Sequence, residues 1–220
     1  MIIPDFLKTK PLFMLMKPFA MVQYGPPRSG STLIYNIMCE LFPTKKIFKV
    51  HMKRKMCSVL VTVGTYRNPL DSIASSLLRY KIEKPSDEDI KKQIDVFNKS
   101  DLKYIPKMIE MSNILMLKYE NFLNNYDYIF DHFEEFFSIK ILTEKRTFLK
   151  EKLGMKSVEK KLKSMDDKFG EMDKNSQLHG NHISKFKGCS GYYKKIMTEK
   201  QISMLLDEFG ETMQLLGYEI

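Results

Sequence analysis

The residues best suited to chemistry begin in a short glycine-containing segment, GPPRSGST, which starts at Gly25. An apolar run at 20–24 precedes it and predicts a strand, and apolar residues at helical spacing across 31–41 predict a helix after it. Glycine lets the backbone turn tightly so that amide N–H groups face a phosphate, and a helix N-terminus adds partial positive charge. The segment therefore predicts a phosphate-binding loop. Its candidate ligand-binding residues are Pro27, Arg28, Ser29, Gly30, Ser31 and Thr32.

The spacing of this loop nearly matches the P-loop of nucleoside triphosphatases, G-x4-G-K-[ST], but Ser31 occupies the lysine position. In those enzymes the lysine reaches the β- and γ-phosphates, and the next hydroxyl binds magnesium. Arg28, inside the loop, is a substitute for the missing cation. The pattern argues against ATP or GTP hydrolysis and favours binding of a 5'-phosphate. An ordinary Gly/Pro turn between strand and helix is the alternative interpretation.

A second anion site is predicted after the apolar, β-branched run at 59–65, which has the composition of a strand buried on both faces. Arg67 follows this strand, and Ser75 comes eight residues later on a predicted helix at 69–80. Ligands of open α/β sheets bind outside the carboxyl ends of the strands. Arg67 and Ser75 are therefore expected to converge on one anion.

A candidate base ends a further strand, predicted at 47–50. His51 has an intrinsic pKa suited to accepting a proton near neutral pH; the alternative is a histidine that is only hydrogen-bonded or exposed. Lys49 either adds positive charge near the reaction or is a surface lysine. The basic cluster at 53–55 either attracts an anionic acceptor or forms a solvated turn.

The order strand, helix, strand, strand, helix predicts βαβ units and a parallel sheet. The rest of the chain is mostly helical in pattern. The further predicted elements are a capped helix at 86–100, a strand at 114–117, an amphipathic helix at 125–137, a lysine-rich helical stretch at 143–165, a loop at 170–191 and a capped final helix at 198–217.

Composition limits the class of protein. The 220 residues, 43% of them hydrophobic, predict one domain spanning 1–220, with 1–17 as a flanking arm. Lysines interrupt the apolar part of that arm, so no transmembrane segment is expected. The formal net charge of +9 favours an anionic ligand, but no stacking motif or recognition helix supports a nucleic-acid partner.

Cysteine and histidine spacing argues against a metal or disulfide framework. The three cysteines are far apart with no CxxC pair, which fits reduced thiols in a cytoplasmic protein. His179 and His182 are three residues apart, but no third ligand lies at useful spacing. No metal site is expected.

Taken together, PRSGST and the later Arg-Asn-Pro-x5-Ser resemble the sulfotransferase superfamily. The resemblance implies an α/β fold: three α/β/α layers with a central parallel sheet, like the P-loop NTPases, and a largely helical C-terminal half. It implies 3'-phosphoadenosine 5'-phosphosulfate (PAPS) as co-substrate. Its first motif would bind the 5'-phosphosulfate, and Arg67 and Ser75 would bind the 3'-phosphate.

Three more segments carry the resemblance. Lys49-Val50-His51 is similar to the family's Lys-x-His, whose histidine is the general base in many members. The segment from Leu117 to Glu120 is similar to a strand of the family that ends in Tyr-Glu. Lys187 and Gly188 begin a segment that is similar to the family's late loop, which closes over the 3'-phosphate. Lys185 is the alternative to Lys187 as the lysine that contacts this phosphate. Tyr193 stands where the family has tryptophan.

The resemblance implies a sulfotransferase that moves a sulfuryl group to a hydroxyl, or less readily an amine. His51 would be the base, and Arg28 and Lys49 would assist the transfer. The acceptor would be a small molecule, a sugar or a lipid. The alternatives are a divergent P-loop kinase of nucleotides or small molecules, which the missing lysine disfavours, and a non-catalytic nucleotide-binding protein.

Overall fold

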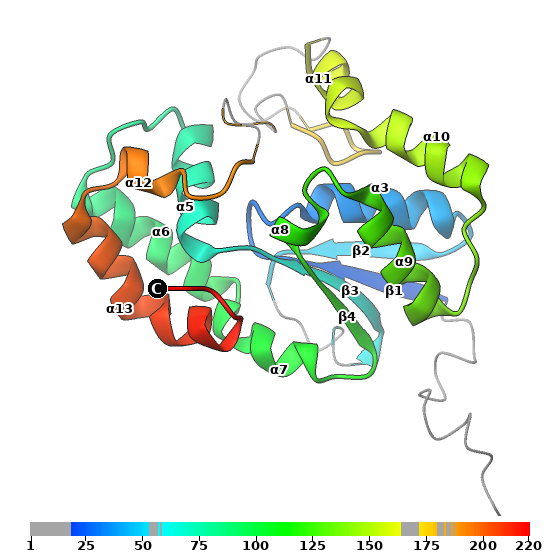
Figure 1. Cartoon of the computed structure of the whole chain (residues 1–220), viewed down its shortest axis with the longest axis horizontal. Helices are drawn as coiled ribbons and strands as arrows, with labels where there is room; N and C mark the ends of the chain where they lie inside the picture. Colours follow the sequence, from blue (N-terminus) through cyan, green and yellow to red (C-terminus); the bar gives the residue numbers. More distant parts are fainter. Residues whose placement is uncertain are drawn as a thin grey trace, which may run out of the picture.

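A computed structural model of the chain describes residues 19–52, 57, 59–163, 172–179, 183, 186 and 188–220. In this part of the chain, four parallel strands form a sheet in the order β2-β1-β3-β4 (Figure 1). The strands are β1 (Ala20–Tyr24), β2 (Lys46–Val50), β3 (Val61–Tyr66) and β4 (Ile114–Lys118). Because all strands run the same way, their carboxyl ends meet at one edge of the sheet.

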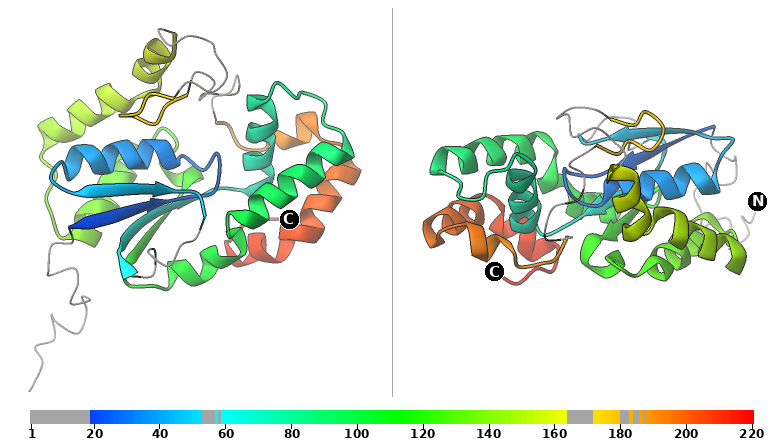
Figure 2. Two further views of the ribbon diagram at one scale, coloured as in Figure 1. Left: turned by 180° about the vertical axis from the view of Figure 1, so that it is seen from behind. Right: turned by 90° about the horizontal axis from the view of Figure 1, so that it is seen from above.

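Helices cover both faces of the sheet, in two groups that lie on opposite sides of the molecule (Figures 1 and 2). One group contains α3 (Ser31–Leu41), α8 (Tyr119–Phe122), α9 (Tyr126–Phe137) and α10 (Thr143–Leu153). The other contains α5 (Pro69–Arg79), α6 (Asp87–Lys99), α7 (Ile105–Ile109) and α13 (Glu199–Leu215). The short elements are a 3-10 helix (Leu102–Tyr104), α11 (Met155–Lys163) and α12 (Tyr193–Ile196). The fold is thus the expected three-layer α/β/α arrangement.

Alternation along the strands divides the core in two. Met21 of β1 packs in the cluster with α3, whereas Val22 and Tyr24 pack in the cluster with α5 and α13. Successive side chains of a strand point to opposite faces, so one strand supplies both layers. The central β3 is buried at every position from Val61 to Thr65, as its apolar sequence predicted.

Two helices that begin at the carboxyl edge of the sheet have well-defined starts. The N-cap of α3 is Gly30, at φ 81, and an added Cβ there would lie 2.7 Å from the ring of Phe122. Asn68 caps α5, because its Oδ1 accepts from the backbone N–H groups of Leu70 and Asp71 at 2.9 and 3.4 Å. Both caps fix helix N-termini next to the predicted anion sites.

The predicted strands and helices are confirmed within the described residues, with small changes at their ends. The third strand begins at Val61, two residues later than predicted, and both predicted capping boxes are present. The lysine-rich stretch divides into α10 and α11 at Gly154. The helices α7, α8 and α12 were not predicted, and each is only four or five residues long.

Several predictions lie outside the described residues: the arm at 1–17, the basic cluster at 53–55, and His182, Lys185 and Lys187. Beyond β4, the described chain is helix and loop, apart from an isolated bridge between Met172 and His179. The C-terminal half is therefore largely helical, as predicted. None of the helices in the described ranges is both long and apolar enough to cross a membrane.

Candidate anion-binding site

The predicted phosphate loop joins β1 to α3 and is fastened to the neighbouring strand β3. Ser29 is fully buried, and its Oγ donates to the Pro26 carbonyl at 2.7 Å. The same Oγ lies 2.8 Å from the Oγ1 of Thr65, near the end of β3. These contacts fasten the buried side of the loop to itself and to β3. The other side of the loop is not used by them and can contact a ligand.

Arg28 connects this loop with the second predicted site. Its Nε donates to the Oγ of Ser75, on α5, at 3.0 Å, and its own backbone carbonyl accepts from Arg67 NH1 at 3.4 Å. Arg28 has φ 64, in the left-handed region that non-glycine residues seldom adopt. The structure therefore brings Arg28, Arg67 and Ser75, three candidates singled out in the sequence, close together at the carboxyl edge of the sheet.

Arg67 is almost fully buried, with 4% of its surface exposed. Its NH2 donates to the carbonyls of Gly188 and Cys189 at 2.9 and 3.2 Å, and its guanidinium lies over the Tyr119 ring, 4.4 Å from the centroid. Its Nε has no hydrogen-bond partner in the described part of the chain. A buried donor without a partner is costly, so an incoming acceptor such as a phosphate oxygen would be stabilised there.

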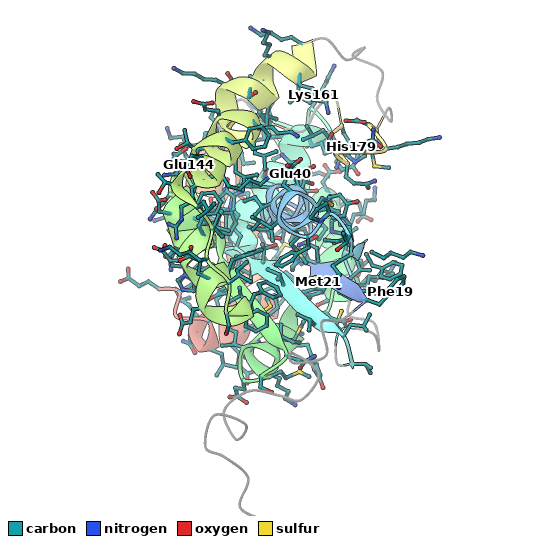
Figure 3. The ribbon with its side chains drawn as sticks, turned by 90° about the vertical axis from the view of Figure 1, so that its right-hand side faces the viewer. Phe19, Met21, Glu40, Glu144, Lys161 and His179 are labelled. Carbon is teal, nitrogen blue, oxygen red and sulfur yellow. The ribbon has the colours of Figure 1, made fainter. Side chains whose placement is uncertain are left out.

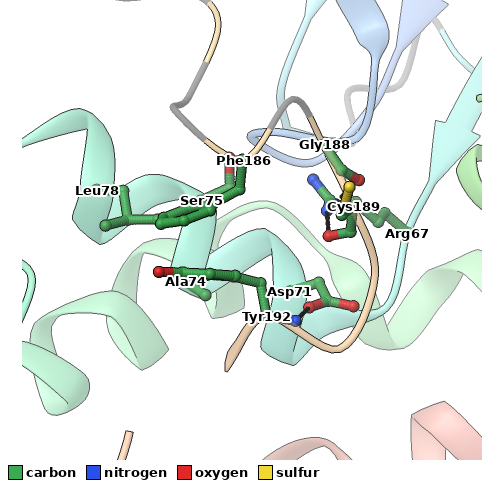
Figure 4. Close-up of a pocket in the computed structure, with 9 residues that line it drawn as sticks. All are labelled: Arg67, Asp71, Ala74, Ser75, Leu78, Phe186, Gly188, Cys189 and Tyr192. Carbon is green, nitrogen blue, oxygen red and sulfur yellow. Dashed lines mark hydrogen bonds between the residues drawn. The ribbon is translucent and has the colours of Figure 1, made fainter. Parts of the chain in front are cut away.

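The late loop lies over this second site and is anchored by Asp71. One carboxylate oxygen of Asp71 accepts from the backbone N–H of Gly191 at 2.9 Å. The other accepts from the backbone N–H of Tyr192 at 3.0 Å (Figure 4). Gly188 has φ 81, and a Cβ at this position would overlap the Tyr119 hydroxyl. The result is a small pocket between α5 and the loop. The pocket is lined by Arg67, Asp71, Ala74, Ser75, Leu78, Phe186, Gly188, Cys189 and Tyr192.

His51 and Lys49 reach the same edge of the sheet from β2. The Nδ1 of His51 lies 2.8 Å from the Gly25 carbonyl. Because a carbonyl only accepts, Nδ1 carries the proton and Nε2 is left as the basic nitrogen. Partial removal from water lowers the pKa of His51, and the charges of Lys49 and Arg79 lower that pKa further. His51 is therefore neutral at pH 7 and able to accept a proton.

The pKa values of the cations show how positive the site is. Burial, then Arg79, lowers the pKa of Lys49 to about 8, while its Nζ donates to Thr32 Oγ1 at 2.6 Å. Burial, then the charges of Arg79 and Arg67, lowers the pKa of Arg28 to about 10. The dominant nearby charges thus have one sign, a field that favours binding of an anion.

Some residues of the site were not predicted from the sequence. Arg79 lies one helical turn after Ser75, and that spacing was the available signal. Asp71 gave no signal, because its role depends on the late loop folding back over α5. Tyr119 was noted in the sequence only as part of the Tyr-Glu strand end, and its contact with Arg67 was not predicted. Among the described residues, no group of three or more His, Cys, Asp or Glu side chains is arranged to hold a metal ion.

No protein-family model matches the sequence, and no curated protein matches it significantly. Solved structures do match. A mouse sulfotransferase, SULT7A1, complexed with PAP superposes with a TM-score of 0.68 at 15% identity, over 96% of this chain and 94% of that chain. Retinol dehydratase in complex with retinol and PAP gives a TM-score of 0.64 at 12% identity, over 92% of this chain and 83% of that one. A complex of retinol dehydratase with androsterone and PAP gives 0.60 at 13% identity, over 92% and 82%. The chain has the fold of the sulfotransferases.

Proposed function

We propose that this protein is a sulfotransferase that moves the sulfuryl group of PAPS to a hydroxyl of a small-molecule acceptor. The observation that carries the proposal is the contact between Arg28 and Ser75, through which the two predicted phosphate motifs form one site. The likeness in fold to structures that contain PAP, the 3',5'-bisphosphate product of PAPS, supports it.

Each end of the nucleotide has its own binding group in this proposal. Arg28 and the backbone N–H groups of the loop bind the 5'-phosphosulfate at the start of α3. Arg67 and Ser75 bind the 3'-phosphate, with the late loop closing over it at Gly188. Lys185 or Lys187 adds a cation from that loop.

The transfer is an in-line displacement at sulfur. The acceptor oxygen forms a bond to sulfur while the bond from sulfur to the 5'-phosphate oxygen breaks, and His51 takes the acceptor proton on Nε2. Negative charge develops on the departing phosphate oxygen, which Arg28 and Lys49 stabilise. Stabilisation by fixed charges in a partly desolvated site is usually the largest contribution to such catalysis.

The acceptor is proposed as a small hydroxyl compound. Two of the matching structures contain retinol or androsterone, each of which is a small molecule. A sugar, a lipid or an amine stays a prediction for this chain, as does a cytoplasmic location.

Binding of PAP is the direct test. Titration calorimetry in the presence of EDTA should show that PAP binds without metal and more tightly than ATP with magnesium. Incubation of the protein with PAPS and an acceptor library, read by mass spectrometry, should give products heavier by one sulfuryl group. Preference for ATP with magnesium, and phosphate transfer instead, would establish the kinase alternative. Binding of PAP with no transfer to any acceptor, and no effect of replacing His51, would favour the non-catalytic alternative.

A further inference from the structure

The backbone that carries Arg67 lies just beyond the paired part of the sheet. Pairing of β3 with β4 ends at Tyr66↔Lys118, one residue before Arg67. At this point a side chain replaces the strand as the hydrogen-bond partner, because the backbone N–H of Asn68 donates to Oε1 of Glu120 at 2.9 Å. That N–H belongs to the planar peptide group that joins Arg67 to Asn68, so the contact fixes the backbone next to the Arg67 side chain.

The second oxygen of the Glu120 carboxylate is held by the C-terminal segment. The Tyr218 hydroxyl donates to Oε2 of Glu120 at 3.0 Å. Burial raises the pKa of Tyr218, and the charge of Glu120 raises that pKa further, so the hydroxyl remains protonated and able to donate. With one donor on each oxygen, the carboxylate is held in a single orientation toward Asn68.

Tyr218 is brought to Glu120 by the turn that ends α13. Gly217 has φ 70, and the backbone N–H of Tyr218 donates to the Met213 carbonyl at 2.9 Å, which is the pattern of a Schellman motif. The turn directs the Tyr218 ring to the ends of β3 and β4. There the ring lies edge-on to the Tyr66 ring, with 6.5 Å between centroids, and the Nζ of Lys118 is 3.9 Å from the Tyr218 centroid.

The ring of Tyr218 and its hydroxyl make contacts with different consequences. A phenylalanine ring in its place would make the same contacts with the two strand ends and would anchor the C-terminal segment there. The hydroxyl instead contacts Glu120, which directly follows Tyr119, and the Tyr119 ring centroid lies 4.4 Å from the Arg67 guanidinium. The start of α8 therefore holds Arg67 twice, through the ring of Tyr119 and through the peptide group that Glu120 binds.

The direction of the Arg67 side chain decides whether it can bind an anion well. Its NH2 is occupied by the late loop, whereas its buried Nε has no hydrogen-bond partner among the described residues. The guanidinium is planar, so the direction of the Nε–H is set once the backbone and the NH2 contacts are set. Hydrogen bonds weaken steeply when donor and acceptor are misaligned, so a rotated peptide group at Arg67 would weaken the contact with a phosphate oxygen.

We propose that Tyr218 is a positioning residue for the 3'-phosphate, because its hydroxyl orients Glu120 and Glu120 fixes the peptide group beside Arg67. This inference rests on the proposed function, and it makes the C-terminal segment part of what selects a bisphosphorylated nucleotide. Tyr218 itself contacts neither nucleotide nor acceptor in this proposal. It acts from behind the site, as the supporting groups of a preorganised binding residue do.

Calorimetry with PAP and with AMP tests the inference on the full-length protein. The ratio of the two Kd values isolates the contribution of the 3'-phosphate, because AMP lacks that group. Tyr218→Phe keeps the ring and removes the hydroxyl, so PAP should bind about fivefold more weakly while the Kd for AMP stays the same. Tyr126→Phe is the matched control, because it removes a tyrosine hydroxyl that donates to the Leu153 carbonyl at 2.8 Å, and it should leave the ratio unchanged.

A double-mutant cycle tests whether Tyr218 acts through Glu120. Glu120→Met removes both carboxylate contacts and should lower the preference for PAP over AMP at least as much as Tyr218→Phe does. The double variant should lose no more than Glu120→Met alone. Glu40→Met is the matched control for the lost carboxylate: Glu40, on α3, also has a donor on each oxygen, Lys152 at 2.7 Å and Lys145 at 3.1 Å (Figure 3). It should leave the ratio of Kd values unchanged.

The outcomes separate this inference from the proposed function. An unchanged ratio in Tyr218→Phe, with PAP bound normally, would overturn the inference and leave the sulfotransferase proposal in place. Equal weakening of PAP and AMP would assign Tyr218 a general structural role and overturn the inference as well. Additive losses in the double variant would show that Tyr218 does not act through Glu120. Failure of the unmodified protein to bind PAP would overturn the proposed function itself.

Discussion

The Nε of Arg28 and the Oγ of Ser75 are 3.0 Å apart, although 47 residues separate them in the sequence. The contact exists because β1 and β3 are neighbours, paired from Met21↔Val61 to Tyr24↔Gly64. The loop after β1 and the helix after β3 therefore start side by side. One anionic ligand can then contact both segments.

Arg28 should contribute strongly to nucleotide affinity. Arg28→Gly removes the guanidinium, and glycine accepts φ 64 without strain, so the loop should keep its shape. Loss of a charge-assisted hydrogen bond worth about 1.5–3 kcal/mol should weaken PAP binding by roughly 10- to 100-fold. Calorimetry measures this. Lys81→Gly is the matched control, because exposed Lys81 also has positive φ (61). Equal losses in both variants would contradict a specific role for Arg28.

His51 should govern the acid side of the rate profile. Its pKa is lowered from the ordinary value of 6.5, so kcat/KM should fall only as the pH drops below 6.5, where the ring becomes protonated. His51→Gln should reduce transfer by about 10²- to 10⁴-fold and leave the Kd for PAP unchanged. His132→Gln, on α9, is the control. An acid limb that persists unchanged in His51→Gln would show that another group is the base.

Lys49 should take up a proton when PAP binds. Its pKa is about 8 in the free protein, so near pH 8 about half of the molecules carry a neutral amine. An adjacent anion raises the pKa of an amine, and binding should therefore take up roughly half a proton at that pH and much less near pH 6.5. Calorimetry in buffers of different ionisation enthalpy measures the uptake. The same uptake in Lys49→Met would refute the assignment.

Asp71 should set the preference for a 3'-phosphate. Asp71→Asn keeps one acceptor oxygen but places an NH2 against a backbone N–H of Gly191 or Tyr192, so the late loop should loosen. PAP affinity should fall about tenfold, whereas affinity for AMP, which lacks the 3'-phosphate, should be unaffected. Asp95→Asn, at an exposed position of α6, is the control. Equal weakening of PAP and AMP would indicate a general loss of structure.

Gly30 should be essential to the stability of the loop. Gly30→Ala combines left-handed strain with a Cβ only 2.7 Å from the Phe122 ring. The expected loss is about 2–4 kcal/mol in the free energy of unfolding, the sum of backbone strain and overpacking. Gly217→Ala isolates the strain, because Gly217 has φ 70 with no atom within 4 Å of the added Cβ, and it should cost about 1 kcal/mol. Urea unfolding compares the two, and similar losses would mean that the contact with Phe122 relaxes freely.

Much of the fold could be predicted from local pattern. Short apolar runs and β-branched composition located all four strands of the described sheet, and Ser86 and Thr198 located two helix starts. Short helices such as α7 and α8 were missed because four or five residues are too few to establish a period.

Local patterns were enough to identify the residue types of the site: a loop with Arg28, an arginine after a buried strand, and a serine eight residues later. These are local features, since a turn, a cap or a strand end depends on a few neighbouring residues. The approach of Arg28 to Ser75, and the grip of Asp71 on a loop 120 residues away, could be seen only in the folded chain. Those relationships arise from the order of the strands and the return of the late loop over α5, and no local pattern encodes the distance between segments that the chain brings together from so far apart.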